Sequence, residues 1–125
     1  TGQGVQQDHA TALKYYKLAA DQGLAVAQSN LGVNYSNGHG VQQDDRVAAS
    51  YFKLAAKQGE TNAIAELGIL FKVGSLVQVT GLTSNSDLNG ATGAVVKTLN
   101  NGRAAVVLEG QTKPQSIRHL NLDPL

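Results

Sequence analysis

Residues 15–20 read Tyr-Tyr-Lys-Leu-Ala-Ala, and residues 51–56 read Tyr-Phe-Lys-Leu-Ala-Ala. The same offset of 36 positions relates residues 4–8 to residues 40–44, which both read Gly-Val-Gln-Gln-Asp. The register between the two segments holds over roughly one repeat length, and chance does not sustain such a match. The first half of the chain is therefore predicted to be an internal repeat.

Each copy of the repeat predicts a pair of helices. The copies span about residues 4–39 and 40–73, and apolar side chains recur in both at helical spacing. Asp8 and Asp44 stand where an N-cap is expected, because a carboxylate oxygen accepts hydrogen bonds from free first-turn N–H groups. Gly23 follows the first helix and suits a turn that needs positive φ.

The positions shared by the copies resemble a known repeat pattern. In the first copy they are Ala12, Tyr15, Tyr16, Ala19, Ala20, Gln22, Gly23, Ala27, Leu31, Gly32 and Tyr35. This pattern resembles the Sel1-like repeat family over about residues 1–74. The resemblance implies a right-handed α-solenoid of stacked helix pairs with a concave face that binds partners. It also implies an adaptor or scaffold role without chemistry of its own.

Beyond residue 73 the helical pattern stops and strand propensity begins. Strands are predicted at about residues 76–80, 93–98, 103–108 and 116–118. Asn100-Asn101-Gly102 lies between the second and third of these and predicts a tight hairpin. Residues 119–122 predict a helical turn or tail, and Pro124 is predicted to end regular structure.

The order of these strands, with Gly90-x-x-Gly93-x-Val95 among them, resembles SH3-like barrels and the glycine core of KOW modules over about residues 74–124. The predicted fold class is therefore α+β with two domains. Residues 1–73 are predicted to form an α-α solenoid of two Sel1-like helix pairs, and residues 74–125 a small SH3-like β-barrel. The barrel is predicted to cap the solenoid or to act as a second interaction module. We also expect the chain to be a fragment with further repeats upstream.

Candidate binding residues follow from the resemblance, which places the first helix of each pair on the concave face. Tyr15 and Tyr51 are then the tyrosines expected to be partly exposed there. Tyrosine suits interfaces, because it combines an apolar ring with a polar tip. The polar companions predicted beside them are Lys14, Ser50, Gln22 and Gln58. The expected partner is a protein or a peptide.

Two alternatives to this adaptor remain open. In the first, the barrel is a nucleic-acid or ribosome-associated module, with phosphate contacts from Lys97, Arg103, Lys113 and Arg118. The formal net charge of only +1 and the lack of aromatic residues after residue 72 disfavour it, because phosphates need clustered cations and bases stack on aromatic rings. In the second, the chain is a structural subunit of a larger assembly.

Other function classes are disfavoured by what the sequence lacks. The chain has no cysteine, and His9, His39 and His119 share no ligand spacing, so no metal site and no cofactor are predicted. No nucleophile elbow or acid–base pair stands out, which predicts that the protein is not an enzyme. No apolar run is long enough for a membrane span. No pattern fixes the compartment, for which the cytoplasm is the default.

Overall fold

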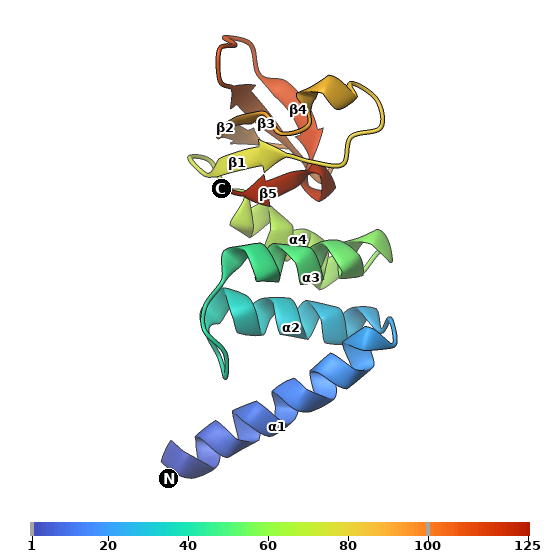
Figure 1. Ribbon diagram of the computed structural model, residues 1–125, viewed down its shortest axis with the longest axis vertical. Helices are drawn as coiled ribbons and strands as arrows, with labels where there is room; N and C mark the ends of the chain where they lie inside the picture. Colours follow the sequence, from blue (N-terminus) through green and yellow to red (C-terminus); the bar gives the residue numbers. More distant parts are fainter. Residues whose placement is uncertain (1, 100) are drawn as a thin grey trace. The chain divides into compact units, whose positions relative to one another are not determined.

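The computed structural model describes the backbone of residues 2–99 and 101–125, and side chains from residue 10 onward except residue 100. The chain divides into two compact units, residues 1–64 and 65–125. Four α-helices come first: α1 (Gly2–Asp21), α2 (Ala25–Asn37), α3 (Asp45–Lys57) and α4 (Thr61–Leu70). A five-stranded antiparallel sheet follows (Figure 1). The predicted α+β class is confirmed.

α1 and α3 end in turns of the same type, one in each copy of the repeat. Gly23 and Gly59 both have positive φ, at 88° and 81°. After α1, the Leu24 N–H donates to the Ala19 carbonyl at 3.2 Å, and the Gly23 N–H donates to Ala20. The equivalent bonds recur one repeat later after α3. This paired pattern is a Schellman motif, which satisfies the last free carbonyls of each helix.

The two predicted N-caps have different outcomes. Asp44 caps α3, because its carboxylate accepts hydrogen bonds from the Arg46 N–H at 3.0 Å and the Val47 N–H at 3.2 Å. Asp8 lies inside α1, so its predicted cap role is wrong. The Asp44 N–H donates to the Tyr35 carbonyl at 2.9 Å, and this bond holds the loop before Asp44 against the end of α2. The residues before Asp8 follow no described helix, and they continue α1 instead.

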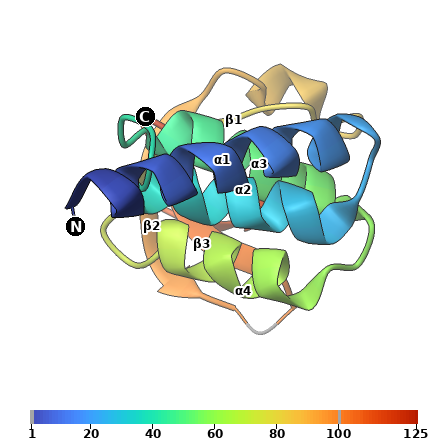
Figure 2. The same ribbon diagram turned by 90° about the horizontal axis from the view of Figure 1, so that it is seen from below.

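The core of the first unit forms around α2, which packs against both α1 and α3 (Figures 1 and 2). Ala20, Ala27 and Leu31 are buried together at its centre. The half-buried side chains that pack on them are Leu13, Tyr16, Ala19 and Tyr51. Small residues let the helix backbones approach, and the larger side chains fill the remaining space.

Gly32 shows how close α2 and α3 are. A Cβ at this position would lie less than 3.0 Å from three ring carbons of Phe52. The Phe52 ring is almost fully buried, at 1% exposure. The glycine therefore provides the space that this ring occupies.

The second unit contains the end of α4 and the sheet. The strands are β1 (Leu76–Val79), β2 (Thr92–Thr98), β3 (Arg103–Leu108), β4 (Gln115–Arg118) and β5 (Leu122–Pro124). Two 3₁₀ turns, η1 (Ser86–Leu88) and η2 (His119–Asn121), lie before β2 and between β4 and β5. The strand order is β4-β3-β2-β1-β5, and all neighbouring strands are antiparallel.

The inner face of the sheet carries the core of this unit, with side chains alternating between the two faces as strand geometry requires. On β3, Ala104, Val106 and Leu108 are buried and the residues between them are not. The other buried strand residues are Val77, Val79, Val95, Ile117 and Leu122. The four predicted strands are confirmed to within one residue at each end.

β5 is the strand that the sequence did not predict. Residues 119–122 were expected to form a helical turn or tail, but the turn η2 ends at Asn121, and Leu122 begins a strand on β1. The Asn121 carbonyl accepts the Thr80 N–H at 2.9 Å, which brings the segment onto the edge of β1. Leu122 is fully buried there. In the predicted hairpin, Gly102 has the expected positive φ of 74°, and Asn100 lies outside the described residues.

Candidate protein interaction site

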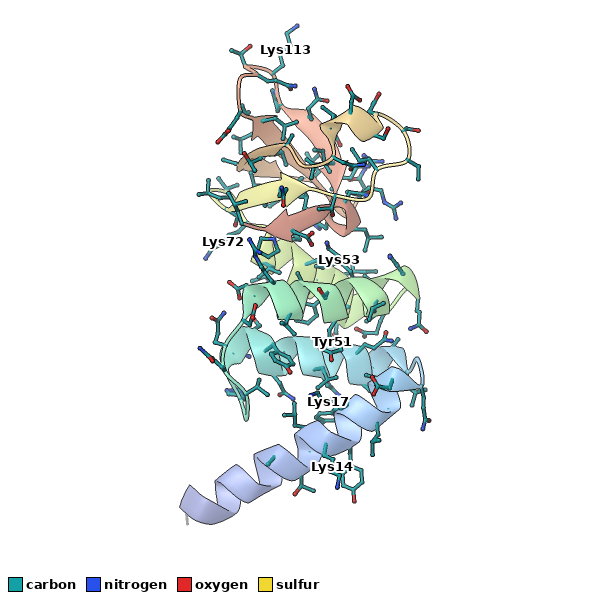
Figure 3. All side chains as sticks on the ribbon, viewed as in Figure 1. Lys14, Lys17, Tyr51, Lys53, Lys72 and Lys113 are labelled. Atoms are coloured by element: carbon teal, nitrogen blue, oxygen red, sulfur yellow. The ribbon has the colours of Figure 1, made fainter. Side chains whose placement is uncertain are left out.

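An exposed apolar stripe runs along α1. Tyr15, Leu18 and Gln22 are spaced by three and four residues, so they share one side of the helix. Tyr15 is 65% exposed and Leu18 is 54% exposed. Leu13, Tyr16 and their buried neighbours point to the core instead. Lys14 is exposed beside Tyr15, and Figure 3 shows it on α1.

The equivalent stripe on α3 consists of Tyr51, Leu54 and Gln58. Leu54 is 47% exposed, while Tyr51 is half-buried. The Tyr51 ring stacks on Tyr35 of α2, with 5.8 Å between ring centroids and 19° between ring planes. Tyr15 has no such stacking partner among the described side chains, which explains why it is more exposed than Tyr51. We call these two sets of three residues the Tyr–Leu–Gln stripes.

The two leucines of the stripes were not among the predicted site residues. The signal was present in the sequence, because Leu18 and Leu54 occupy equivalent positions in the two copies. Their place in the repeat did not by itself distinguish a core residue from a surface residue. Their exposure shows that neither belongs to the core.

Gln58 has a structural role inside the first unit. Its side-chain Nε2 donates to the Gly23 carbonyl at 3.0 Å and to Oε1 of Gln28 at 3.0 Å. Gln28 is only 5% exposed, and its own amide donates to the Ala20 carbonyl at 3.4 Å. This chain joins the end of α3 to the turn between α1 and α2. Gln22, the equivalent residue of the first copy, is exposed and has no side-chain hydrogen bond to the described residues.

Two further polar residues in and after α3 bond locally. The exposed Ser50 donates from its hydroxyl to the Arg46 carbonyl at 3.1 Å. Glu60 precedes α4, and its carboxylate accepts from the Asn62 N–H at 3.1 Å and the Ala63 N–H at 2.7 Å. Partial burial raises the pKa of Glu60, but these bonds and one from the Ser29 hydroxyl hold the pKa below its ordinary value of 4.5. Glu60 therefore caps α4, a role that was not predicted from the sequence.

The four basic residues of the alternative site are partly brought together. Arg103 on β3 and Arg118 on β4 are direct cross-strand partners. Lys97 on β2 pairs with Ala105, two residues from Arg103 along β3. Lys113 lies apart, in the loop between β3 and β4 (Figure 3). None of these four side chains forms an ion pair with a residue that the structure describes.

His119 is the one buried titratable group in the described part of the sheet unit. It is 5% exposed, its ring lies 5.8 Å from that of Phe71, and Nε2 has no hydrogen-bond partner among the described atoms. Burial lowers the pKa of His119 below its ordinary value of 6.5, because desolvation disfavours the charged ring. This ring is a packed, neutral core residue.

The described residues contain no group of three or more metal-ligating side chains. Among the helices described, none combines the length and apolar character that crossing a bilayer requires.

Residues 1–24 and 25–60 match the family model of the Sel1 repeat. Residues 1–60 of the helical part therefore match Sel1 repeats. The second match covers 36 residues, the same length as the internal offset, but it starts at α2 instead of α1. The matched ranges end at residue 60, before α4 begins. Sel1 repeats generally mediate protein–protein interactions and are generally non-catalytic.

A solved structure supports the same assignment. The crystal structure of a Sel1 repeat protein from Oxalobacter formigenes aligns with a TM-score of 0.50 and 44% sequence identity. The alignment covers 56% of this chain and 29% of that protein, so this chain corresponds to only part of its length. No match was found among curated proteins.

Proposed function

We propose that the chain is a non-enzymatic adaptor or scaffold that binds a protein or peptide partner through the Tyr–Leu–Gln stripes. The observation that carries the proposal is the exposure of Leu18 and Leu54 at matching positions of the two copies, with Tyr15 exposed beside Leu18. Single exposed apolar residues are ordinary on protein surfaces. A set that repeats with the fold has a regular spacing, which a partner segment can match.

The residues around the stripes fit this use. Lys14 and Gln22 are exposed next to Tyr15 and Leu18, so polar groups border the apolar contact, as at the rim of many interfaces. The family resemblance places these first helices on the concave side of the solenoid. Gln58 contributes less to binding in this proposal, because its amide is already bonded to Gly23 and Gln28.

The sheet unit has a secondary place in the proposal. We infer that residues 74–125 are an SH3-like barrel, with the domain boundary near residue 73. The strand order and the 3₁₀ turn between β4 and β5 support that inference. The nucleic-acid alternative has weaker support, because Lys113 lies apart from the other three cations and no aromatic residue follows Phe71.

The test compares partner capture by matched variants. Tyr15→Ala with Leu18→Ala removes most of the exposed apolar area of the α1 stripe. Val26→Ala is the control, because Val26 is 65% exposed on α2, outside both stripes. We expect the double variant to lose a specific protein that the parent chain and the control retain, with an unchanged circular dichroism spectrum. Retention of every partner by the folded double variant would sink the proposal.

A further inference from the structure

One edge of the sheet carries a local concentration of positive charge. β4 is the terminal strand in the order β4-β3-β2-β1-β5, so one side of its backbone has no strand partner in the described sheet. Between Gly110 and Leu122 the sequence has two cations, Lys113 and Arg118, and no Asp or Glu. An unpaired strand edge is a template for another strand.

Arg103 adds a second arginine to this edge, beside Arg118. Its guanidinium Nη1 donates to the Ser116 carbonyl in the middle of β4, at 3.2 Å. The side chain thus reaches from β3 across to β4, and its other N–H groups remain available, because a guanidinium has five donors. We define the β4 edge as residues Gln115–Arg118 together with the Arg103 guanidinium.

Arg103 and Arg118 stand close together, and no acidic residue among those described forms an ion pair with either. They are direct cross-strand partners, and like charges in such pairs are destabilising. Ser116 and Arg118 are exposed on one face of β4, while Ile117 between them is buried. The charge is therefore held on the open face and at the edge of the strand.

We propose that the β4 edge binds an extended acidic segment of a protein partner by strand addition. Backbone hydrogen bonds to the open-edge groups of β4 other than the Ser116 carbonyl, which already accepts from Arg103, would supply affinity. Carboxylates at alternate positions would meet Arg103 and Arg118. A second copy of this chain fits poorly, because its β4 would bring the same two arginines. This surface is separate from the Tyr–Leu–Gln stripes and does not depend on the function proposed for them.

Nucleic acid is the less favoured occupant. It offers phosphates to the same cations, but it cannot add a strand to the free backbone of β4. The described part of residues 73–125 also provides no aromatic ring for a base, and its one histidine ring, His119, is buried. A peptide uses both features of the edge, whereas a polynucleotide uses only the charge.

The experiment titrates the full chain against a short fluorescein-labelled peptide of alternating valine and glutamate, followed by anisotropy. Two matched peptides separate the contribution of charge from that of backbone hydrogen bonds. One has glutamine in place of glutamate, and the other is N-methylated at alternate backbone amides. Arg118→Glu is the test variant. Lys57→Glu is the control, because it makes the same charge change at an exposed site on α3.

We expect the glutamate peptide to bind and to protect amide protons of β4 from exchange. Arg118→Glu should weaken binding about tenfold or more, and Lys57→Glu by less than about twofold. Both matched peptides should bind much more weakly. No binding of the glutamate peptide, or equal binding of the N-methylated peptide, would overturn strand addition. Binding of oligodeoxythymidylate instead of the peptide, with the same dependence on Arg118, would assign the edge to nucleic acid.

Discussion

Replacing Gly32 by alanine tests the packing of the helical repeats. An added methyl group would lie less than 3.0 Å from three ring carbons of Phe52, which is too close for ordinary contact. The ring is 1% exposed and cannot move into solvent without opening the space between α2 and α3. Overpacking costs about 1–3 kcal/mol, and three contacts this short to a buried ring place Gly32→Ala in the upper part of that range, at about 2–3 kcal/mol. Alanine regains about 1 kcal/mol in helix propensity over glycine.

The expected net loss is therefore about 1–2 kcal/mol in the free energy of unfolding. For a unit of this size that corresponds to a fall of at least about 5 °C in Tm. The assay is urea and thermal denaturation followed by far-ultraviolet circular dichroism at the helix minimum. The helices α1, α2 and α3 dominate that signal, so it reports the unit in which Gly32 lies.

The repeat supplies a matched control for this substitution. Gly68 is the equivalent of Gly32 one repeat later, and an added Cβ there would meet only His119 Cε1, at 3.9 Å. That distance is ordinary contact, so Gly68→Ala should leave stability unchanged or raise it by up to about 1 kcal/mol. Two equivalent glycines are thus expected to respond with opposite signs.

A second variant identifies the cause. Phe52→Leu removes ring atoms that the Gly32→Ala methyl group would meet, so the double variant should lose less stability than the sum of the single changes. If Gly32→Ala is as stable as the parent chain, the packing argument is refuted. Strict additivity in the double variant would refute the assignment of the clash to Phe52.

Three further predictions concern other parts of the chain. Gly93→Ala should destabilise the sheet unit by about 2–3 kcal/mol, because its Cβ would press on the backbone of Val107, which cannot rotate away; thermal unfolding measures it. His119 has a folded pKa below its unfolded value of 6.5, so the unfolded chain binds more protons as pH falls. Stability should therefore fall below about pH 6.5, and His119→Leu should flatten that part of the curve, as urea midpoints from pH 8 to pH 5 would show. Gln58→Ala leaves the Gly23 carbonyl without its side-chain donor, so amide exchange in the turn after α1 should become faster while the other turn glycines are unchanged.

Much of the fold was predictable because the sequence contains the helix-pair pattern twice. The match between Tyr15 and Tyr51, and between Gly23 and Gly59, requires two similar helix pairs with the same turn. Strand propensity and the Asn-Gly signal located β1 to β4. These features are local, so periodicity and turn chemistry reveal them.

The features that the sequence did not reveal depend on distant neighbours. Asp8 repeats the sequence around Asp44, but within the described residues it is the loop before Asp44 that is bonded to the end of a preceding helix. β5 is short and forms because it pairs with β1, and no local sequence pattern predicts that pairing. Gln58 looks like a free surface amide until the turn at Gly23 comes within hydrogen-bond distance. Each depends on segments that meet only after folding.

The most direct test of the proposed interaction surface is site-specific photo-crosslinking. A photoreactive phenylalanine analogue is placed at Leu18, within the α1 stripe, or at Val26, which is at least as exposed but lies outside the stripe. The account predicts a light-dependent adduct with one specific protein from the source lysate at Leu18 and none at Val26. Equal labelling from both positions, or none from Leu18, would contradict it.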